Sequence, residues 1–200
     1  MRESAKAPHG VARRRPRPPA AAGFGLLEVL ISAGLIIGLA AGTAQLTVRS
    51  IDAIDAAGKL TQGLLLAVQK MEQLQSLEWR YDASGLVAVS DMTTDLSRDP
   101  PAAGGPGLRV SPPDSLDRGV PGYVDYLDGG GAWVGTGSRP PVGTTFVRRW
   151  SVQAGQPPLD DLLVLDVVVL PLRLAESSGG AALAPNQPGL VWLGALKRRR

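Results

Sequence analysis

The side chains that could do chemistry in this chain are mainly carboxylates and hydroxyls. The sequence contains no cysteine and one histidine, His9, which lies in a stretch rich in proline and alanine. This composition excludes disulfide frameworks, thiolate metal sites and a cysteine nucleophile, and it argues against catalytic triads or metal sites built on histidine. The sequence shows no combination of nucleophile, base and oxyanion donor, so we predict no enzyme activity, no cofactor and no metal site.

The aspartates that cluster in the sequence are Asp125, Asp128, Asp160, Asp161 and Asp166. The first two stand next to the glycines 129–131, but their spacing is not that of an EF-hand calcium loop. A hairpin turn is the favoured interpretation, because Asp-Gly pairs are typical of such turns. The last three flank or interrupt a predicted strand, and we interpret them as a solvated strand edge rather than a catalytic pair.

Glu28 is the one acid in a long apolar segment. Between Glu28 and Arg49 lie 20 residues without a charge. A helix of that length rises about 30 Å, the thickness of a membrane's hydrocarbon core, so we predict a transmembrane part at about 26–48. An acid at mid-bilayer costs about 2.5–3.5 kcal/mol, less near the edge, and is by default functional. The alternative is a carboxylate that merely reaches water at the membrane surface.

The charges around this segment predict its orientation. Residues 1–23 have a net charge of +5, whereas the flank that follows the apolar segment is neutral. The positive-inside rule then places the N-terminus in the cytoplasm and the residues after about 50 outside it. A cleaved secretory signal peptide is the alternative, with small residues at 40–44 as its cleavage site. Against it, the helical pattern continues, and no proline occurs between Pro19 and Pro100.

A second periodic pattern extends the predicted helix to residues 24–79. Its apolar or small positions step by four and three residues: Ala53, Ala57, Leu60, Leu64, Ala67, Met71 and Leu74. Such spacing is typical of one face of a helix. We therefore predict a single long helix, half membrane span and half amphipathic, in which Leu60 and Leu64 contact the core of the following domain.

The remaining residues, 80–200, predict a head rich in β-structure. Prolines and glycines divide 84–120 into loops, and apolar or alternating runs then predict strands at 120–127, 144–152, 162–170 and 189–196. In 144–152, Phe146, Arg148, Trp150 and Val152 share one face. The expected fold class is α+β: a small antiparallel sheet packs its apolar face on the amphipathic half of the long helix.

The string Gly23-Phe24-Gly25-Leu26-Leu27-Glu28 resembles the processing site of type IV prepilins and type II secretion pseudopilins. In that family a basic leader ends in glycine, a membrane peptidase cuts after it, and the next residue becomes an N-methylated N-terminus. The resemblance implies cleavage between Gly23 and Phe24, removal of residues 1–23, and a pilin-like fold. Gly25 stands where the family usually has Thr or Ser, the leader is longer than the family's shortest leaders, and the C-terminal cysteines of some pilins are absent.

The resemblance implies a structural rather than enzymatic role, as a minor pilin or pseudopilin most like the PilV-type minor pilins. Its implied partners are the prepilin peptidase, other pilin or pseudopilin subunits and the bacterial inner membrane, with the head in the periplasm. Glu28 would pair with the Phe24 amine of a neighbouring subunit. The alternative function is a single-pass membrane-anchored periplasmic binding module that never assembles.

Two further features leave alternatives open. Gly34, Gly38 and Gly42 form a stripe of small residues that favours close packing of helices in membranes, although glycine is also common in membrane helices. The cluster Lys197–Arg200 is interpreted as a solvated tail, with contact to an acidic partner or DNA as the alternative. Because the basic residues gather at the two ends rather than on one folded face, nucleic-acid binding is not predicted.

Overall fold

The computed structural model describes residues 25–156, 159 and 161–200. Gly23, Phe24 and Asp160 therefore lie outside the described residues. The chain divides into two compact units between Arg49 and Ser50.

The first element is α1, a helix of 51 residues from Leu26 to Ser76. It contains no proline, and the strong helix formers Leu and Ala recur along its whole length. The helix ends three residues before the predicted end, because Trp79 belongs to the first strand of the head instead. One continuous helix therefore runs from the apolar segment into the second unit.

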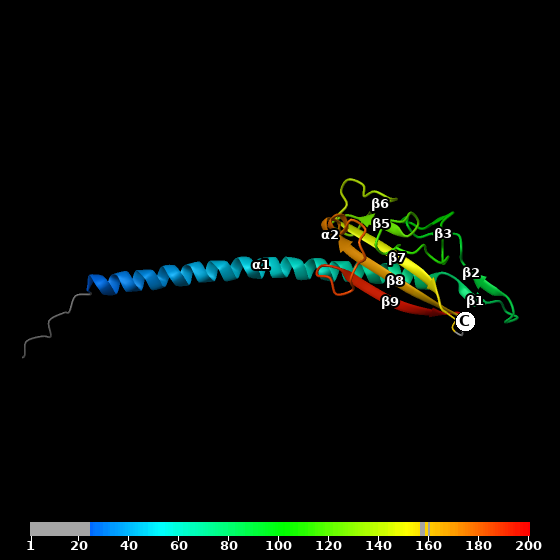
Figure 1. Ribbon diagram of the computed structural model, residues 1–200, viewed down its shortest axis with the longest axis horizontal. Coiled ribbons are helices and arrows are strands. Elements are labelled where there is room, and N and C mark those ends of the chain that lie inside the picture. The colour runs from blue at the N-terminus through cyan, green and yellow to red at the C-terminus, as the bar shows by residue number, and fades with distance from the viewer. Residues whose placement is uncertain (1–24, 157–158, 160) are drawn as a thin grey trace, which may run out of the picture. The chain divides into compact units, whose positions relative to one another are not determined.

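The second unit, residues 50–200, contains the predicted head and the C-terminal part of α1, and the whole unit is called the head from here on. It is built on a five-stranded antiparallel sheet with the order β6-β5-β7-β8-β9 (Figure 1). Its strands are β5 (Val124–Leu127), β6 (Trp133–Thr136), β7 (Phe146–Ala154), β8 (Leu162–Pro171) and β9 (Val191–Arg198). Two ribbons accompany it: β1 (Trp79–Tyr81) with β2 (Ala88–Ser90), and β3 (Thr94–Asp95) with β4 (Ala102–Ala103). A short helix, α2 (Leu172–Ser178), follows β8.

All four predicted strands are present, and the α+β class is confirmed. The first strand begins four residues late, at Val124, because the amide of Tyr123 bonds to the carbonyl of Val120 and closes a turn there. The interpretation of Asp166 as part of a strand edge is wrong. Asp166 lies in β8, which pairs with β7 on one side and β9 on the other.

The core of the head lies between the sheet and the C-terminal half of α1. Phe146, Trp150 and Val152 of β7 are buried in it, as the alternation predicted. A smaller apolar cluster covers the opposite face of the sheet, where Val147 and Val168 pack beneath α2 and the segment before β9. Both faces of the central strands are therefore covered.

The predicted helix face is correct near its C-terminal end and wrong before it. Leu60 and Leu64 are 41% and 47% exposed. The buried face consists of Gly63, Leu66, Ala67, Lys70, Met71 and Leu74. A strict alternation of four and three residues averages 3.5 per turn, so it drifts by about 20° every heptad around a straight helix. The close approach of β9 to α1 also determines which face of the helix is buried. Gly63 lies against this strand, and a Cβ atom at that position would be 3.1 Å from the Cγ2 atom of Val191.

The basic C-terminal residues are not a solvated tail. Lys197 of β9 donates hydrogen bonds to the carbonyls of Leu74 and Gln75, which are at the C-terminal end of α1. Helix ends leave such carbonyls without partners, and a cation is favoured there. The guanidinium of Arg199 lies 3.8 Å from the centre of the Trp79 ring. The cluster thus fastens the last strand to the end of the helix.

Candidate functional site

Glu28 lies in the first turn of α1 and its side chain is exposed. The amides of Glu28 and Val29 both bond to the carbonyl of Gly25, which closes this first turn at 2.9 and 3.2 Å. A carboxylate is electrostatically favoured at the N-terminal end of a helix. Glu28 is also the only ionisable residue from Gly25 to Val48.

The segment around Glu28 is apolar and uncovered. Every residue from Gly25 to Ser50 is exposed in the isolated chain. The large side chains among them include Leu30, Ile31, Leu35, Ile36, Ile37 and Leu39. The helix is long and apolar enough to cross a membrane. So much apolar surface is unfavourable in water, and lipid or other helices would have to cover it.

The glycine stripe on this segment is open. A Cβ atom placed on Gly34, Gly38 or Gly42 would meet no atom within 4 Å. These positions therefore have no steric need for glycine within the isolated chain. Gly23 and Phe24, the predicted processing residues, lie outside the described residues.

A second site, inside the head, was not predicted: a buried cluster of three charged side chains. The carboxylate of Asp125 on β5 receives two hydrogen bonds from Arg148 on β7, at 2.9 Å from Nε and 2.8 Å from Nη2. The ammonium of Lys70 on α1 lies 2.9 Å from the same carboxylate. The exposed fractions are 1% for Lys70 and Asp125 and 2% for Arg148. We call these three residues the ion cluster.

The ion cluster joins the helix to the sheet through further hydrogen bonds. Arg148 Nη1 donates to the carbonyl of Leu66 at 3.0 Å and to Gln69 Oε1 at 3.1 Å, both on α1. Lys70 Nζ donates to the carbonyl of Leu96 at 2.6 Å and lies 4.5 Å from the centre of the Trp150 ring. Each of the three charged groups is therefore bonded to another member of the cluster, and both cations also donate to a backbone carbonyl. Its arrangement is that of an ionic lock between α1, β5 and β7.

This finding corrects the interpretation of Asp125 as part of a hairpin turn. Asp125 is in β5. Asp128 alone forms the turn, where its Oδ1 accepts hydrogen bonds from the amides of Gly130 and Ala132. Among the described residues no group of acids and histidines is arranged to hold a metal ion. Two signals pointed to the cluster: Lys70 on the buried face of α1, and Arg148 on the inward face of its strand.

The ion cluster contains two cations and one anion. Burial lowers the pKa of Lys70 to about 8, with Arg148 adding to the effect, whereas Asp125 acts in the opposite direction. The unfolded chain has the ordinary pKa of about 10.5 for this lysine. Between these values the unfolded state binds more protons than the folded state, so the stability of the head should rise with pH.

We expect the free energy of unfolding to increase by about 2 kcal/mol between pH 7 and pH 9.5 from this group alone. The four tryptophans all lie in the head, so their fluorescence during urea unfolding of the detergent-solubilised chain measures it directly. Lys70→Met should remove most of the increase. An equal increase in that variant would show that another group is responsible. The range stops below pH 10 because burial also raises the pKa of Tyr123 and Tyr126. Above their ordinary pKa these two groups make the stability of the head fall with pH, which would mask the effect of Lys70.

The geometry defines an α+β chain, and the part that the structure describes contains one candidate membrane helix. No family model matches this chain, and no match was found among the curated proteins or the solved structures. Its function is therefore inferred from its own residues.

Proposed function

We propose that this chain is a minor pilin or pseudopilin, a non-enzymatic structural subunit. The prepilin peptidase would remove residues 1–23, and the subunit would then assemble through its N-terminal helix into a type IV pilus or a type II secretion pseudopilus. Before assembly it would lie in the inner membrane as a single-pass protein with its head in the periplasm. The head would have a pilin-like fold.

The observation that carries the proposal is the single carboxylate of Glu28 at the start of an exposed apolar helix. A simple anchor gains nothing from an acid in that position, which weakens its affinity for lipid. The residue is preceded by Gly23-Phe24, at the spacing of the prepilin processing site. The open glycine stripe supports the same proposal, because small residues allow neighbouring helices to approach closely.

The chemistry of assembly follows from charge. Cleavage after Gly23 would create a positively charged amine on Phe24, four residues before Glu28. Within hydrocarbon an unpaired amine or carboxylate is costly, so the amine of one subunit and the carboxylate of its neighbour would pair. A subunit in the wrong register would leave both charges unpaired, and this difference in free energy would select the correct register.

Processing provides the first test. We expect the mature chain to begin with N-methylated Phe24, which mass spectrometry of its N-terminal peptide would detect. Gly23→Leu should retain the leader in most molecules, because the peptidase must accommodate a small residue there. Gly25→Ser is the matched control, since it restores the residue type usual in the family and should be cut normally. An intact leader on the wild-type chain would instead favour the membrane-anchored binding module.

A further inference from the structure

The head contains a pocket that the proposed function does not use. Its volume is about 490 Å³, within the range of about 300–1,000 Å³ that is usual for small-molecule sites. It lies over the face of the sheet opposite α1. Ser151 and Gln153 of β7, Trp192 of β9, the loop 111–117 and residues 182–183 line it.

The pocket contains a hydroxyl with unused hydrogen-bonding capacity. Ser151 is only 3% exposed, and no described residue is a hydrogen-bond partner of its Oγ atom. Buried polar groups in folded proteins are nearly always paired, so an unpaired one requires an explanation. A polar group of a ligand in the pocket would supply the missing partner.

An aromatic side chain lines the same pocket and is held in place. Trp192 donates from Nε1 to Oδ1 of Asp166 on the neighbouring strand at 3.0 Å. Gly194 faces the same carboxylate, and a Cβ at that position would lie 3.1 Å from this Oδ1 atom. With its N–H already bonded to the protein, the indole offers a ligand its apolar ring.

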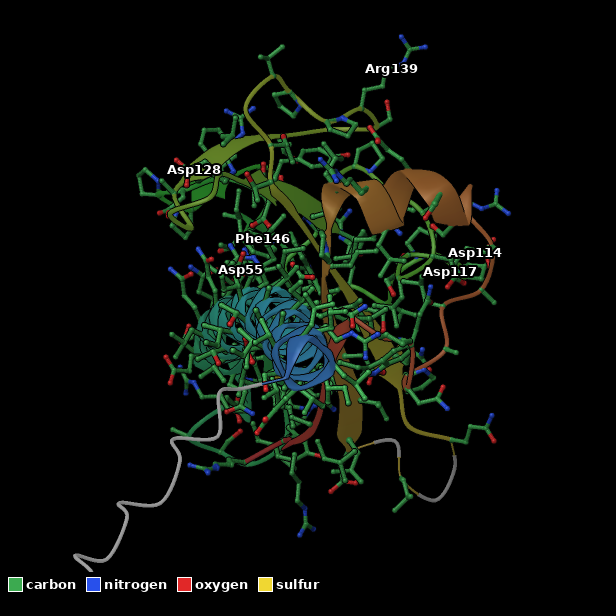
Figure 2. The ribbon with its side chains drawn as sticks, turned by 90° about the vertical axis from the view of Figure 1, so that its left-hand side faces the viewer. Asp55, Asp114, Asp117, Asp128, Arg139 and Phe146 are labelled. Carbon is green, nitrogen blue, oxygen red and sulfur yellow. The ribbon has the colours of Figure 1, made fainter. Side chains whose placement is uncertain are left out.

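The loop 111–117 is fixed before any ligand arrives. Arg149 of β7 donates to the carbonyls of Leu116 and Asp117 at 3.1 and 2.6 Å. The amide of Leu183 donates to Oδ1 of Asp117 at 2.8 Å. Asp114 has a φ of 70°, in the left-handed region that aspartate adopts more readily than most residues, and its carbonyl accepts from the amides of Asp117 and Arg118. Asp114 and Asp117 lie together on the side of the head where α2 is found (Figure 2).

We propose that this pocket binds an uncharged carbohydrate. A sugar ring has an apolar C–H face that stacks on indole, and a rim of hydroxyls that both donate and accept hydrogen bonds. The Ser151 hydroxyl, the Gln153 amide and the carboxylates of Asp114 and Asp117 provide complementary groups. Asp114 is paired with Arg118 at 3.3 Å, but no basic side chain among the described residues lines the pocket, so its two carboxylates still disfavour phosphorylated or acidic ligands. This inference goes beyond the proposed function and does not depend on it.

Saturation-transfer NMR of the full chain tests the proposal, in a detergent that has no sugar headgroup. The probes are glucose, galactose, N-acetylglucosamine and maltose, with glucose 6-phosphate as the charged comparison. We expect transfer to the C–H protons of at least one neutral sugar and none to the phosphate ester. Trp192→Ala should weaken that binding at least tenfold, and Ser151→Ala at least threefold. Ser177→Ala, on the exposed face of α2, is the matched control and should bind as the wild type does.

Ser151→Ala also separates binding from folding. Removing an unpaired buried hydroxyl should leave the thermal midpoint unchanged or raise it, while affinity falls. This variant therefore remains informative if Trp192→Ala fails to fold, as its contact with the apolar cluster allows. Failure of every neutral sugar to bind, preference for glucose 6-phosphate, or unchanged affinity in Ser151→Ala would each overturn the proposal. None of these outcomes bears on whether the leader is cut.

Discussion

Replacing Asp125 by Asn is expected to cause the largest loss of stability of any conservative change in the head. The substitution keeps the shape of the side chain but removes the only anion from a site where Lys70 and Arg148 are both buried. Breaking a buried ion pair from one side typically costs about 3–5 kcal/mol, because the remaining charge has neither water nor an opposite charge beside it. Small domains are stable by only about 5–15 kcal/mol, so the head would be left marginal.

The measurement is urea unfolding followed by tryptophan fluorescence at pH 7, on the detergent-solubilised chain. Lys70→Met is the matched comparison, since it removes one cation and leaves the neutral pair of Arg148 with Asp125. We expect a smaller loss of stability than in Asp125→Asn, because Arg148 and Asp125 still neutralise each other and only the carbonyl of Leu96 loses its hydrogen bond. Leu64→Asp, on the exposed side of α1, should also leave the head folded. A transition in Asp125→Asn at the wild-type urea concentration would refute the ionic lock.

Replacing Glu28 by Leu is expected to separate membrane insertion from assembly. The substitution removes a carboxylate from an apolar helix and adds apolar area, so insertion should be unchanged or improved. Under the proposed function, however, the Phe24 amine of the neighbouring subunit loses its partner. Incorporation into filaments should fall by about tenfold or more, since about 1.4 kcal/mol already corresponds to tenfold.

The experiment compares subunit abundance in membranes with abundance in sheared filaments or in crosslinked complexes with adjacent subunits. Glu28→Asp is the control, because it retains the charge on a shorter side chain and should assemble better than the leucine variant. A general folding defect would lower the abundance in membranes and in filaments together. Loss of the charge pair would lower only the abundance in filaments or crosslinked complexes. Wild-type assembly of Glu28→Leu would mean that Glu28 is only an interfacial charge.

The sequence alone determined the features that depend on local pattern. An uncharged run of 20 residues determines a helix that is long enough to span a membrane, and alternation in 144–152 determined which side of β7 enters the core. The absence of proline determined that the helix continues beyond the apolar segment. These outcomes need only the helix and strand periods, so tertiary contacts did not alter them.

Only the tertiary structure decided the features that depend on contact between distant segments. Lys70, Asp125 and Arg148 are far apart in the sequence, and each alone is typical of a solvated charge. Pairing of β9 with β8 placed Asp166 in an inner strand of the sheet and brought Lys197 to the end of α1. The contact of β9 with Gly63 placed Leu64 on the exposed side of the helix. For the buried charges, the cost of burial is offset by partners that no local pattern could identify.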